Sequence, residues 1–503
     1  MAQPAPRFWS PRFDIETRAD GTILMQQSEP LAEWGRCLPD RLVHWAWARP
    51  DDIFLARRTN GGAWRQLSFI SVLASVRALG SGLLELGLGP ERPLLILSEN
   101  SLEHALIGLA AQYVGVPYAP VSPAYALKSQ DFGKLKGIAE LLKPGLIFAQ
   151  DGARYAAAIA AIRRAGTAVV VVDNHGPLQA ALRFGDLEGR DASPAADAAF
   201  EAITGATVAK YLFTSGSTGS PKAVINTQSM LMANMGMVAD CFRFLEDHPP
   251  VFVDWAPWNH TASGNKVFNM ALMHGGTFHI DDGKPAPGLI DQTIRNLREI
   301  SPTWYFNVPA GWDMLVREME RDAALCQSFF ARLDMMMYAG AGMAQHTWDA
   351  LRRLSRRHAG REVLLVSGLG ATETAPAALM CTEQWQSAGN IGVPERGLIL
   401  KLVPNGGKLE ARLKGPSITP GYFGDPERTA QAFDDEGFYL LGDALKPADP
   451  DDLSRGFFFD GRVAENFKLA TGTWVAVGAL RAALVNAFGG LVSDAVILGE
   501  NRE

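Results

Sequence analysis

Short apolar segments alternate with helical patterns along much of this chain, and the alternation restricts the folds available to it. The segments "RPLLILSEN", "PGLIFAQ" and "TAVVVVDN" are rich in β-branched or long aliphatic residues and end in polar or small ones. Helical patterns such as "SLEHALIGLAAQYVG" separate them. This βαβ order predicts an α/β fold with a sheet buried on both faces.

The same pattern returns in the second half of the chain. "PPVFVDWAP", "PTWYFNVPA", "RLDMMMYAG" and "REVLLVSGLG" each end in Gly, Pro or Ala, where a ligand could approach the backbone. Because ligands of open α/β sheets bind beyond the carboxyl ends of the strands, we expect a site at these ends. From about residue 395 to 461 the sequence is rich in glycine and proline, with short alternating segments that predict a smaller β-rich subdomain.

Composition excludes several classes of protein. A chain of 503 residues is longer than a single hydrophobic core usually supports. Its composition, with 47% apolar and 20% charged residues, is typical of a globular protein. A net charge of −7 without a basic run gives no electrostatic footprint for nucleic acid or an anionic membrane. The start lacks the apolar segment of a signal peptide, and the longest uncharged stretch contains prolines, so it predicts a buried helix and strand. We therefore expect a soluble, cytoplasmic protein whose four widely spaced cysteines are reduced.

The stretch "YLFTSGSTGSPKAV", Tyr211 to Val224, carries the first chemical signal. Its glycines can turn backbone N–H groups inward while hydroxyls and a lysine add donors, which suits a phosphate cradle. It is not a Walker A motif, because Lys222 is followed by a β-type run. It is not a nucleophile elbow, because Ser215 stands where glycine is needed. A mobile hairpin is the alternative, although a turn needs no cation at its exit.

Two further clusters follow strand-like runs. In "GLGATETAP", Thr372 and Glu373 place a hydroxyl beside a carboxylate, a pair that suits Mg²⁺ bound to phosphate oxygens. In "FYLLGDALK", Asp443 can accept two hydrogen bonds from a ribose diol. A solvated glutamate in a turn and an ordinary Gly-Asp turn are the alternatives.

Together and in this order, these clusters and "DGRVAENFK" resemble the adenylate-forming superfamily of acyl-CoA synthetases, peptide-synthetase adenylation domains and luciferases. The likeness spans nearly the whole chain, and the joint occurrence of the motifs makes it specific. It implies an N-terminal adenylation domain over residues 1–461, with two αβαβα-type subdomains and the β-rich subdomain. A hinge and the start of a small C-terminal lid domain would occupy residues 462–503.

The resemblance also implies roles for matching residues. Lys222, Thr372 and Glu373 would act on the phosphates of ATP, Glu373 through Mg²⁺, while Asp443 and Arg462 would hold the ribose. Leu369 stands where the family usually has an aromatic residue against adenine, so affinity for the base would depend more on shape. The implied phosphate-binding residues are Thr214, Ser215, Gly216, Ser217, Thr218, Gly219 and Lys222, and the turn that would line adenine is Gly340, Ala341 and Gly342.

Within the superfamily, "APWNHTASGN" and "AENFKLATGTWVAVGALR" are most similar to feruloyl-CoA synthetases, which activate hydroxycinnamates. His260 matches the family position that borders the acyl site, although a lone histidine is more often a core or surface residue. Trp258 and its neighbour Trp255 would wall a flat aromatic acid or pack in the core. Gly340 and Ala375 are further implied substrate contacts. The implied reactants are a ferulate-like acid, ATP and CoA with Mg²⁺, and other aryl or acyl acids stay open.

The implied chemistry has two steps. The carboxylate of the acid attacks the α-phosphorus of ATP and gives acyl-AMP and pyrophosphate, and the thiol of CoA then attacks the mixed anhydride. The family's lid carries a catalytic lysine in a "PKTxxGK"-like segment, which this sequence lacks. We therefore expect slow adenylate formation, with Lys468 the nearby basic residue and a hinge near Ala464. A non-catalytic nucleotide-binding protein, an ATP-independent amidase and a reductase or peptide-synthetase module are the rivals, and the last would need a serine-bearing carrier segment that this sequence does not show. The apolar helix pattern at 71–89 fits either a core or a homodimer surface.

Overall fold

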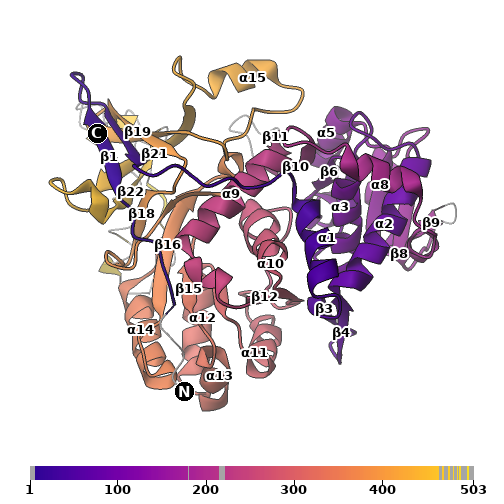
Figure 1. Cartoon of the computed structure of the whole chain (residues 1–503), viewed down its shortest axis with the longest axis horizontal. Coiled ribbons are helices and arrows are strands. Elements are labelled where there is room, and N and C mark those ends of the chain that lie inside the picture. The colour runs from indigo at the N-terminus through magenta and orange to yellow at the C-terminus, as the bar shows by residue number, and fades with distance from the viewer. Residues whose placement is uncertain are drawn as a thin grey trace.

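A computed structural model of the chain describes residues 6–178, 181–214 and 221–463, together with a few positions between 467 and 497. Two large sheets organise these residues. Figure 1 shows the first sheet at the right, formed by the first half of the chain, and the second at the left, formed mainly by the second half with two strands from the N-terminus. Helices α9 (Gln228–Cys241) and α10 (Phe268–His274) lie between them.

The first sheet has seven strands within the described residues, in the order β11-β10-β6-β5-β7-β8-β9. Its strands from β10 to β9 run parallel, as the βαβ pattern predicts, and β11 pairs antiparallel with β10. The strands are β5 (Leu94–Leu97), β6 (Tyr118–Pro120), β7 (Leu146–Asp151), β8 (Ala168–Asp173), β9 (Leu182–Arg183), β10 (Val208–Thr214) and β11 (Lys222–Thr227).

The centre of this sheet is buried on both faces. In β5, Leu94 and Ile96 belong to one apolar cluster, and Leu95 and Leu97 belong to another. The period of two arises because successive side chains of a strand point to opposite faces. Helices α2 (Phe69–Glu85) and α3 (Leu102–Tyr113) supply the first cluster, and α5 (Gly133–Leu142) and α6 (Gly152–Ile162) supply the second.

The second sheet is mixed and has the order β1-β2-β19-β20-β21-β22-β18-β17-β16-β15-β14. β14, β15 and β16 are parallel, and the remaining neighbours are antiparallel. The strands are β1 (Phe13–Thr17), β2 (Ile23–Gln27), β14 (Trp304–Asn307), β15 (Met335–Tyr338), β16 (Leu364–Gly370), β17 (Ala377–Met380), β18 (Asn390–Pro394), β19 (Ile399–Asn405), β20 (Lys408–Lys414), β21 (Tyr439–Pro447) and β22 (Phe457–Arg462).

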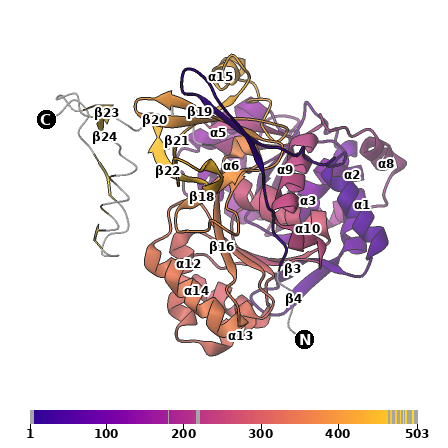
Figure 2. The ribbon, with the colours of Figure 1, turned by 60° about the vertical axis from the view of Figure 1, so that its left-hand side comes forward.

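Helices cover the parallel part of the second sheet. Met336 and Tyr338 of β15 point to one face of the sheet and pack in an apolar cluster with helices α11 to α14. Met335 and Met337 point to the other face and belong to the largest apolar cluster of the described residues. Figure 2 shows α12, α13 and α14 grouped beside β16. The helices are α11 (Ile290–Glu299), α12 (Pro309–Met319), α13 (Ala323–Phe330) and α14 (Gln345–Ala359).

The stretch expected to be β-rich is rich in strands, since β18 to β22 lie between residues 390 and 462, with α15 and η4 in their connections. These strands continue the same sheet as β14 to β17. That the residues from about 395 to 461 form a subdomain of their own therefore stays a prediction.

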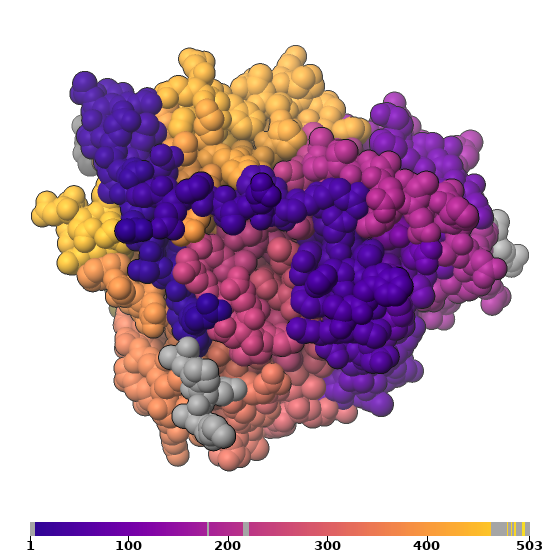
Figure 3. Space-filling model, viewed as in Figure 1, coloured from indigo at the N-terminus to yellow at the C-terminus, as the bar shows by residue number. Residues whose placement is uncertain are grey.

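The N-terminal residues join parts of the chain that are distant in sequence. β1 and β2 extend the second sheet through β19, and Figure 3 shows this segment crossing the surface towards the first half. β3 (Ile53–Arg58) and β4 (Trp64–Ser68) complete a four-stranded sheet with β12 (Val251–Asp254) and β13 (Thr277–Ile280). The sequence analysis placed the run that contains β12 with the strands of the second half and gave β1 to β4 and β13 no partners, because local periodicity does not identify partners so far along the chain.

Short helices fill the remaining connections. All four cysteines are buried and free, as expected. None of the helices in the described ranges is both long and apolar enough to cross a bilayer. The elements are α1 (Leu38–Ala48), α4 (Pro123–Leu127), α7 (Phe184–Glu188), α8 (Pro194–Glu201), α15 (Pro426–Gln431), the π-helix η2 (Ala262–Val267) and the 3-10 turns η1 (Arg243–Glu246), η3 (Thr372–Thr374) and η4 (Leu453–Arg455), with strands β23 (Phe467–Lys468) and β24 (Trp474–Val475) after residue 463.

Candidate active site

The expected phosphate loop begins at the carboxyl edge of the first sheet. Thr214 ends β10 and pairs directly with Lys222, the first residue of β11, so the loop joins two antiparallel strands. The hydroxyl of Thr214 is buried and has no hydrogen-bond partner within the described part of the chain. The other implied phosphate-binding residues, Ser215, Gly216, Ser217, Thr218 and Gly219, lie outside the described residues.

The second cluster lies at the carboxyl end of β16. The backbone N–H of Thr419 donates to the carbonyl of Glu373 at 2.8 Å. The side-chain amide of Asn234, which is fully buried, donates to the carbonyl of Thr374 at 3.1 Å. Two distant elements therefore fix the backbone of η3. The side chain of Glu373 is buried, and that of Thr372 is half-buried.

Lys222 and Glu373 meet although they are 151 residues apart in the sequence. The ammonium Nζ of Lys222 lies 3.3 Å from Oε1 of Glu373. The hydroxyl of Tyr422 donates to the same oxygen at 3.0 Å, and Lys222 Nζ donates to that hydroxyl at 3.2 Å. The sequence analysis assigned both charged residues to one ligand but missed Tyr422. A single tyrosine in "ITPGYFGD" carries no chemical signature that could have revealed it.

Glu373 is the residue to which the sequence analysis assigned Mg²⁺. No group of three or more His, Cys, Asp or Glu side chains in the described ranges could hold a metal by itself. Mg²⁺ commonly uses one or two carboxylates and completes its coordination with phosphate oxygens and water. A single buried carboxylate beside the lysine of the phosphate loop fits that mode of binding, and the metal role of Glu373 stays a prediction.

The expected adenine turn follows β15. Because β15 and β16 are parallel, Gly340–Gly342 and η3 lie at the same edge of the sheet. Gly340 has φ +89°, a backbone conformation that favours glycine, and a Cβ at Gly340 or Gly342 would meet no atom within 4 Å. All three residues of the turn are exposed, and their contact with adenine stays a prediction. Leu369 of β16 is half-buried.

The two residues expected to hold ribose face each other across neighbouring strands. Asp443 of β21 is the direct cross-strand partner of Arg462 of β22. Nε of Arg462 lies 2.9 Å from Oδ1 of Asp443, and the arginine side chain is exposed while the aspartate is buried. The arginine lies close enough to pair with this carboxylate, and the ribose-binding role of both residues stays a prediction.

The segment expected to border the acyl site follows β12. The indole N–H of Trp255 donates to Oδ1 of Asn307 at 3.2 Å, which ties the end of β12 to the end of β14. Nδ1 of His260 accepts a hydrogen bond from the backbone N–H of Ala262 at 3.2 Å. His260 is open to solvent, yet the protein atoms crowded around it lower its pKa by desolvation. Its imidazole is therefore neutral near pH 7.

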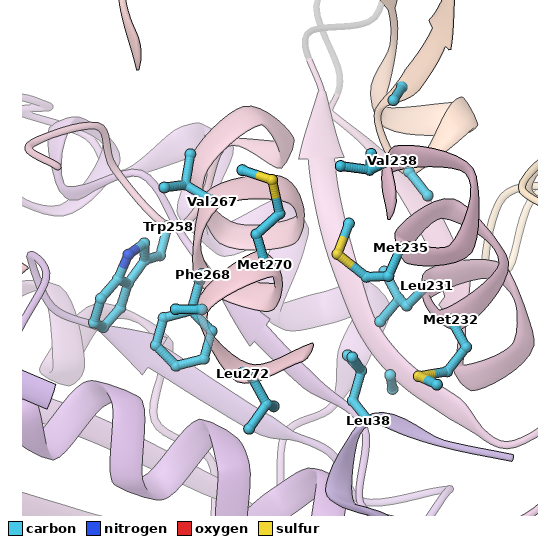
Figure 4. Packing of buried hydrophobic residues seen from close by; sticks show 14 of the residues in the cluster. Leu38, Leu231, Met232, Met235, Val238, Trp258, Val267, Phe268, Met270 and Leu272 are labelled. Atoms are coloured by element: carbon cyan, nitrogen blue, oxygen red, sulfur yellow. The ribbon is translucent and has the colours of Figure 1, made fainter. Parts of the chain in front are cut away.

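Two implied substrate contacts are buried. Trp258 packs edge-on against Phe268 and Phe278 with ring centroids 5.1 and 5.8 Å away. Figure 4 shows Trp258 beside Phe268 and Val267. Ala375 is fully buried and follows η3. The placement of Trp258 matches the core-packing alternative, and contact of either residue with a substrate stays a prediction. Of the other positions weighed, Ala464 and the side chain of Lys468 lie outside the described residues.

The π-helix η2 directly follows His260, and buried groups from other strands hold it. Nζ of Lys210 in β10 donates to the carbonyl of Gly264 at 2.9 Å. Ser263 donates to the carboxylate of Asp254, at the end of β12. Burial lowers the pKa of Lys210 to about 7 and raises that of Asp254 to about 7. Single π-turns frequently occur at functional sites, and no sequence motif pointed to this one.

Comparison with known proteins bears on this arrangement. The family model described as "AMP-binding enzyme" matches residues 42–423. The chain belongs to this family. This AMP-binding enzyme is 24% identical over 441 residues to 4-coumarate-CoA ligase 1 of Narcissus pseudonarcissus, covering 84% of the chain and 75% of that protein. It is 28% identical over 245 residues to feruloyl-CoA synthase of an Amycolatopsis species, covering 47% and 46%.

A third relative is much longer than the chain. The carboxylic acid reductase of Mycobacterium tuberculosis is 27% identical over 322 residues, which are 58% of the chain and 25% of the reductase. The chain thus spans about a quarter of the length of that relative.

Solved structures share the fold of this AMP-binding enzyme. The anthranilate CoA ligase AuaEII in complex with anthranoyl-AMP superposes with a TM-score of 0.73 at 17% identity, covering 91% of the chain and 82% of the ligase. Apo MatB of Rhodopseudomonas palustris gives a TM-score of 0.71 at 19% identity, with 89% and 83% covered. These similarities confirm the predicted α/β adenylation fold.

Proposed function

We propose that this AMP-binding enzyme activates a carboxylic acid with ATP and transfers the acyl group to CoA. The observation that carries the proposal is the ion pair of Lys222, at the amino end of β11 in the first sheet, and Glu373, in η3 after β16 of the second sheet. It offers one cation for phosphate oxygens and one carboxylate for a divalent ion. Relatives named as CoA ligases support this class of reaction.

In the proposed first step, an oxygen of the acid attacks the α-phosphorus of ATP. The bond between that phosphorus and the pyrophosphate oxygen breaks, giving acyl-AMP and pyrophosphate. The acid is its own nucleophile, so Lys222 and Thr372 serve to position the phosphates and to stabilise their charge. Mg²⁺, when held by Glu373, would neutralise phosphate charge. In the second step the CoA sulfur attacks the acyl carbon, and AMP leaves.

For the acid, we propose an aromatic carboxylate of the hydroxycinnamate type. The similarity of "APWNHTASGN" to feruloyl-CoA synthetases and the feruloyl-CoA synthase relative support it. We would titrate the chain with a non-hydrolysable feruloyl-adenylate analogue and with the octanoyl counterpart. At least tenfold tighter binding of the feruloyl compound, about 1.4 kcal/mol, is the expected result. Equal binding would keep the adenylate site and reject the aromatic acid, and binding of neither would reject the proposed function.

Replacing Glu373 by glutamine should raise the Mg²⁺ concentration needed for half-maximal adenylate formation. The change keeps the shape of the side chain but removes the charge that the metal requires. We expect a shift of at least about tenfold, since the loss of even an outer partner of a metal ligand costs that much. A Mg²⁺ titration of pyrophosphate release measures it, with Glu383→Gln on an exposed turn as the matched control. An unshifted titration would remove Glu373 from the metal site.

A further inference from the structure

The hydroxyl of Tyr422 touches both charged residues of the site at once. It donates to Oε1 of Glu373 at 3.0 Å and accepts from Nζ of Lys222 at 3.2 Å, while Nζ also reaches the same Oε1 at 3.3 Å. Within this triangle the phenol donates one hydrogen bond and accepts one, and the side chain of Tyr439 also interacts with the phenol and with Glu373. The lysine ammonium also lies 4.7 Å from the centre of the tyrosine ring, where the ring face attracts a cation.

The backbone around Tyr422 connects the strand of Lys222 to the turn of Glu373. Tyr422 forms an isolated antiparallel bridge with Val224 of β11. The N–H of Phe423 donates to the carbonyl of Ala223 at 2.9 Å. On the other side, Thr419 donates to the carbonyl of Glu373 at 2.8 Å. Residues 419–423 therefore connect β11 of the first sheet to η3, which follows β16 of the second sheet.

The tyrosine hydroxyl is a fixed donor. The side chain is buried, and its hydroxyl lies 3.0 Å from the carboxylate oxygen of Glu373. A phenol is protonated at neutral pH, so it can donate this hydrogen bond. When a polyphosphate draws Lys222 away, this bond still orients Glu373. Without the Tyr422 hydroxyl, Glu373 would be held by the side chain of Tyr439 and by Lys222, whose ammonium the phosphates also require.

From this geometry we infer that Tyr422 is a positioning residue, which orients Glu373 for a magnesium-bound polyphosphate and moderates its ion pair with Lys222. The inference rests on the proposed function, because it names how that site selects its ligand. It predicts that the hydroxyl matters for nucleotide that carries Mg²⁺ and hardly matters for nucleotide without it.

The test is calorimetric binding of a non-hydrolysable ATP analogue to Tyr422→Phe, with and without Mg²⁺. We expect affinity for the magnesium complex to fall about tenfold, the usual loss for a hydrogen bond to a charged group, and affinity without Mg²⁺ to change less than twofold. Tyr155→Phe is the matched control, since Tyr155 is buried in α6 and its hydroxyl has no hydrogen-bond partner within the described ranges. The control should bind both forms as the wild type does.

A second substitution separates positioning from packing. Incorporation of 4-aminophenylalanine at position 422 keeps an N–H donor and should restore most of the affinity for the magnesium complex, also if the phenylalanine variant folds poorly. Unchanged binding by Tyr422→Phe, an equal loss with and without Mg²⁺, or no rescue by the amine would overturn the inference. Failure of the wild type to bind either form would instead overturn the proposed function and the inference with it.

Discussion

Replacing Lys222 by alanine should slow formation of acyl-AMP about a hundredfold, the usual cost of removing a preorganised group that stabilises charge in a transition state. Lys222 is the cation at the exit of the phosphate loop, and Glu373 holds it in place at 3.3 Å. In the proposed reaction it faces phosphate oxygens as their charge redistributes. Single-turnover measurement of acyl-AMP, relative to the wild-type chain, gives the rate directly.

Two comparisons make this result interpretable. Lys136→Ala also removes one lysine charge, but from the exposed face of α5 and outside the residues assigned to the site. This variant should form acyl-AMP at the wild-type rate. Lys222→Arg keeps the positive charge but alters the donor geometry, so it should retain part of the rate. An alanine variant that forms acyl-AMP at the wild-type rate would exclude Lys222 from adenylation.

The parts of the fold that follow from local patterns were predictable from the sequence. The run "RPLLILSEN" contains β5, whose four residues are all buried, and "RLDMMMYAG" contains β15. Both strands are continuous apolar runs because helices cover both of their faces. Lys222 and Glu373 were also recognisable, because each belongs to a short motif with its own chemistry.

Other features depend on contacts between distant segments, and local patterns do not encode them. β3 pairs with β13, more than two hundred residues further along the chain. Tyr422 becomes part of the site only because residues 419–423 lie against β11. In the sequence, Lys210 is a single charged residue within an apolar strand. Its contact became apparent only in the structure, where its ammonium donates a hydrogen bond to the carbonyl of Gly264.

Replacing Lys210 by methionine should stabilise the protein by about 2 kcal/mol at pH 7, because it removes a buried charge and loses only one hydrogen bond. Burial lowers the pKa of Lys210 to about 7, whereas an unfolded chain has a lysine pKa near 10.4. Between pH 7 and about pH 10.4, Lys210 is therefore protonated in the unfolded chain and largely unprotonated in the folded chain. Wild-type stability therefore rises with pH by up to about 1.4 kcal/mol per unit, and the methionine variant lacks this rise.

Denaturant unfolding of both proteins from pH 7 to pH 9.5 measures the difference, and the gap should shrink as pH rises. His104 of α3 and Tyr118 of β6, which lie near Lys210, titrate outside this range, since burial lowers the pKa of His104 to about 4 and raises that of Tyr118. Lys136→Met should give a constant difference. A constant gap for Lys210→Met as well would mean that the folded protein does not depress the pKa of this amine.

The same variant bears on why the chain keeps a costly buried amine. Its hydrogen bond to Gly264 connects β10, which leads into the phosphate loop, to the π-helix that follows His260. Where a strained or buried polar group serves function, its replacement commonly stabilises the protein and slows turnover. We expect both effects for Lys210→Met. If Lys210→Met is more stable and also turns over as fast as the wild type, the amine contributes nothing to the position of η2, and its burial has no functional explanation in this structure.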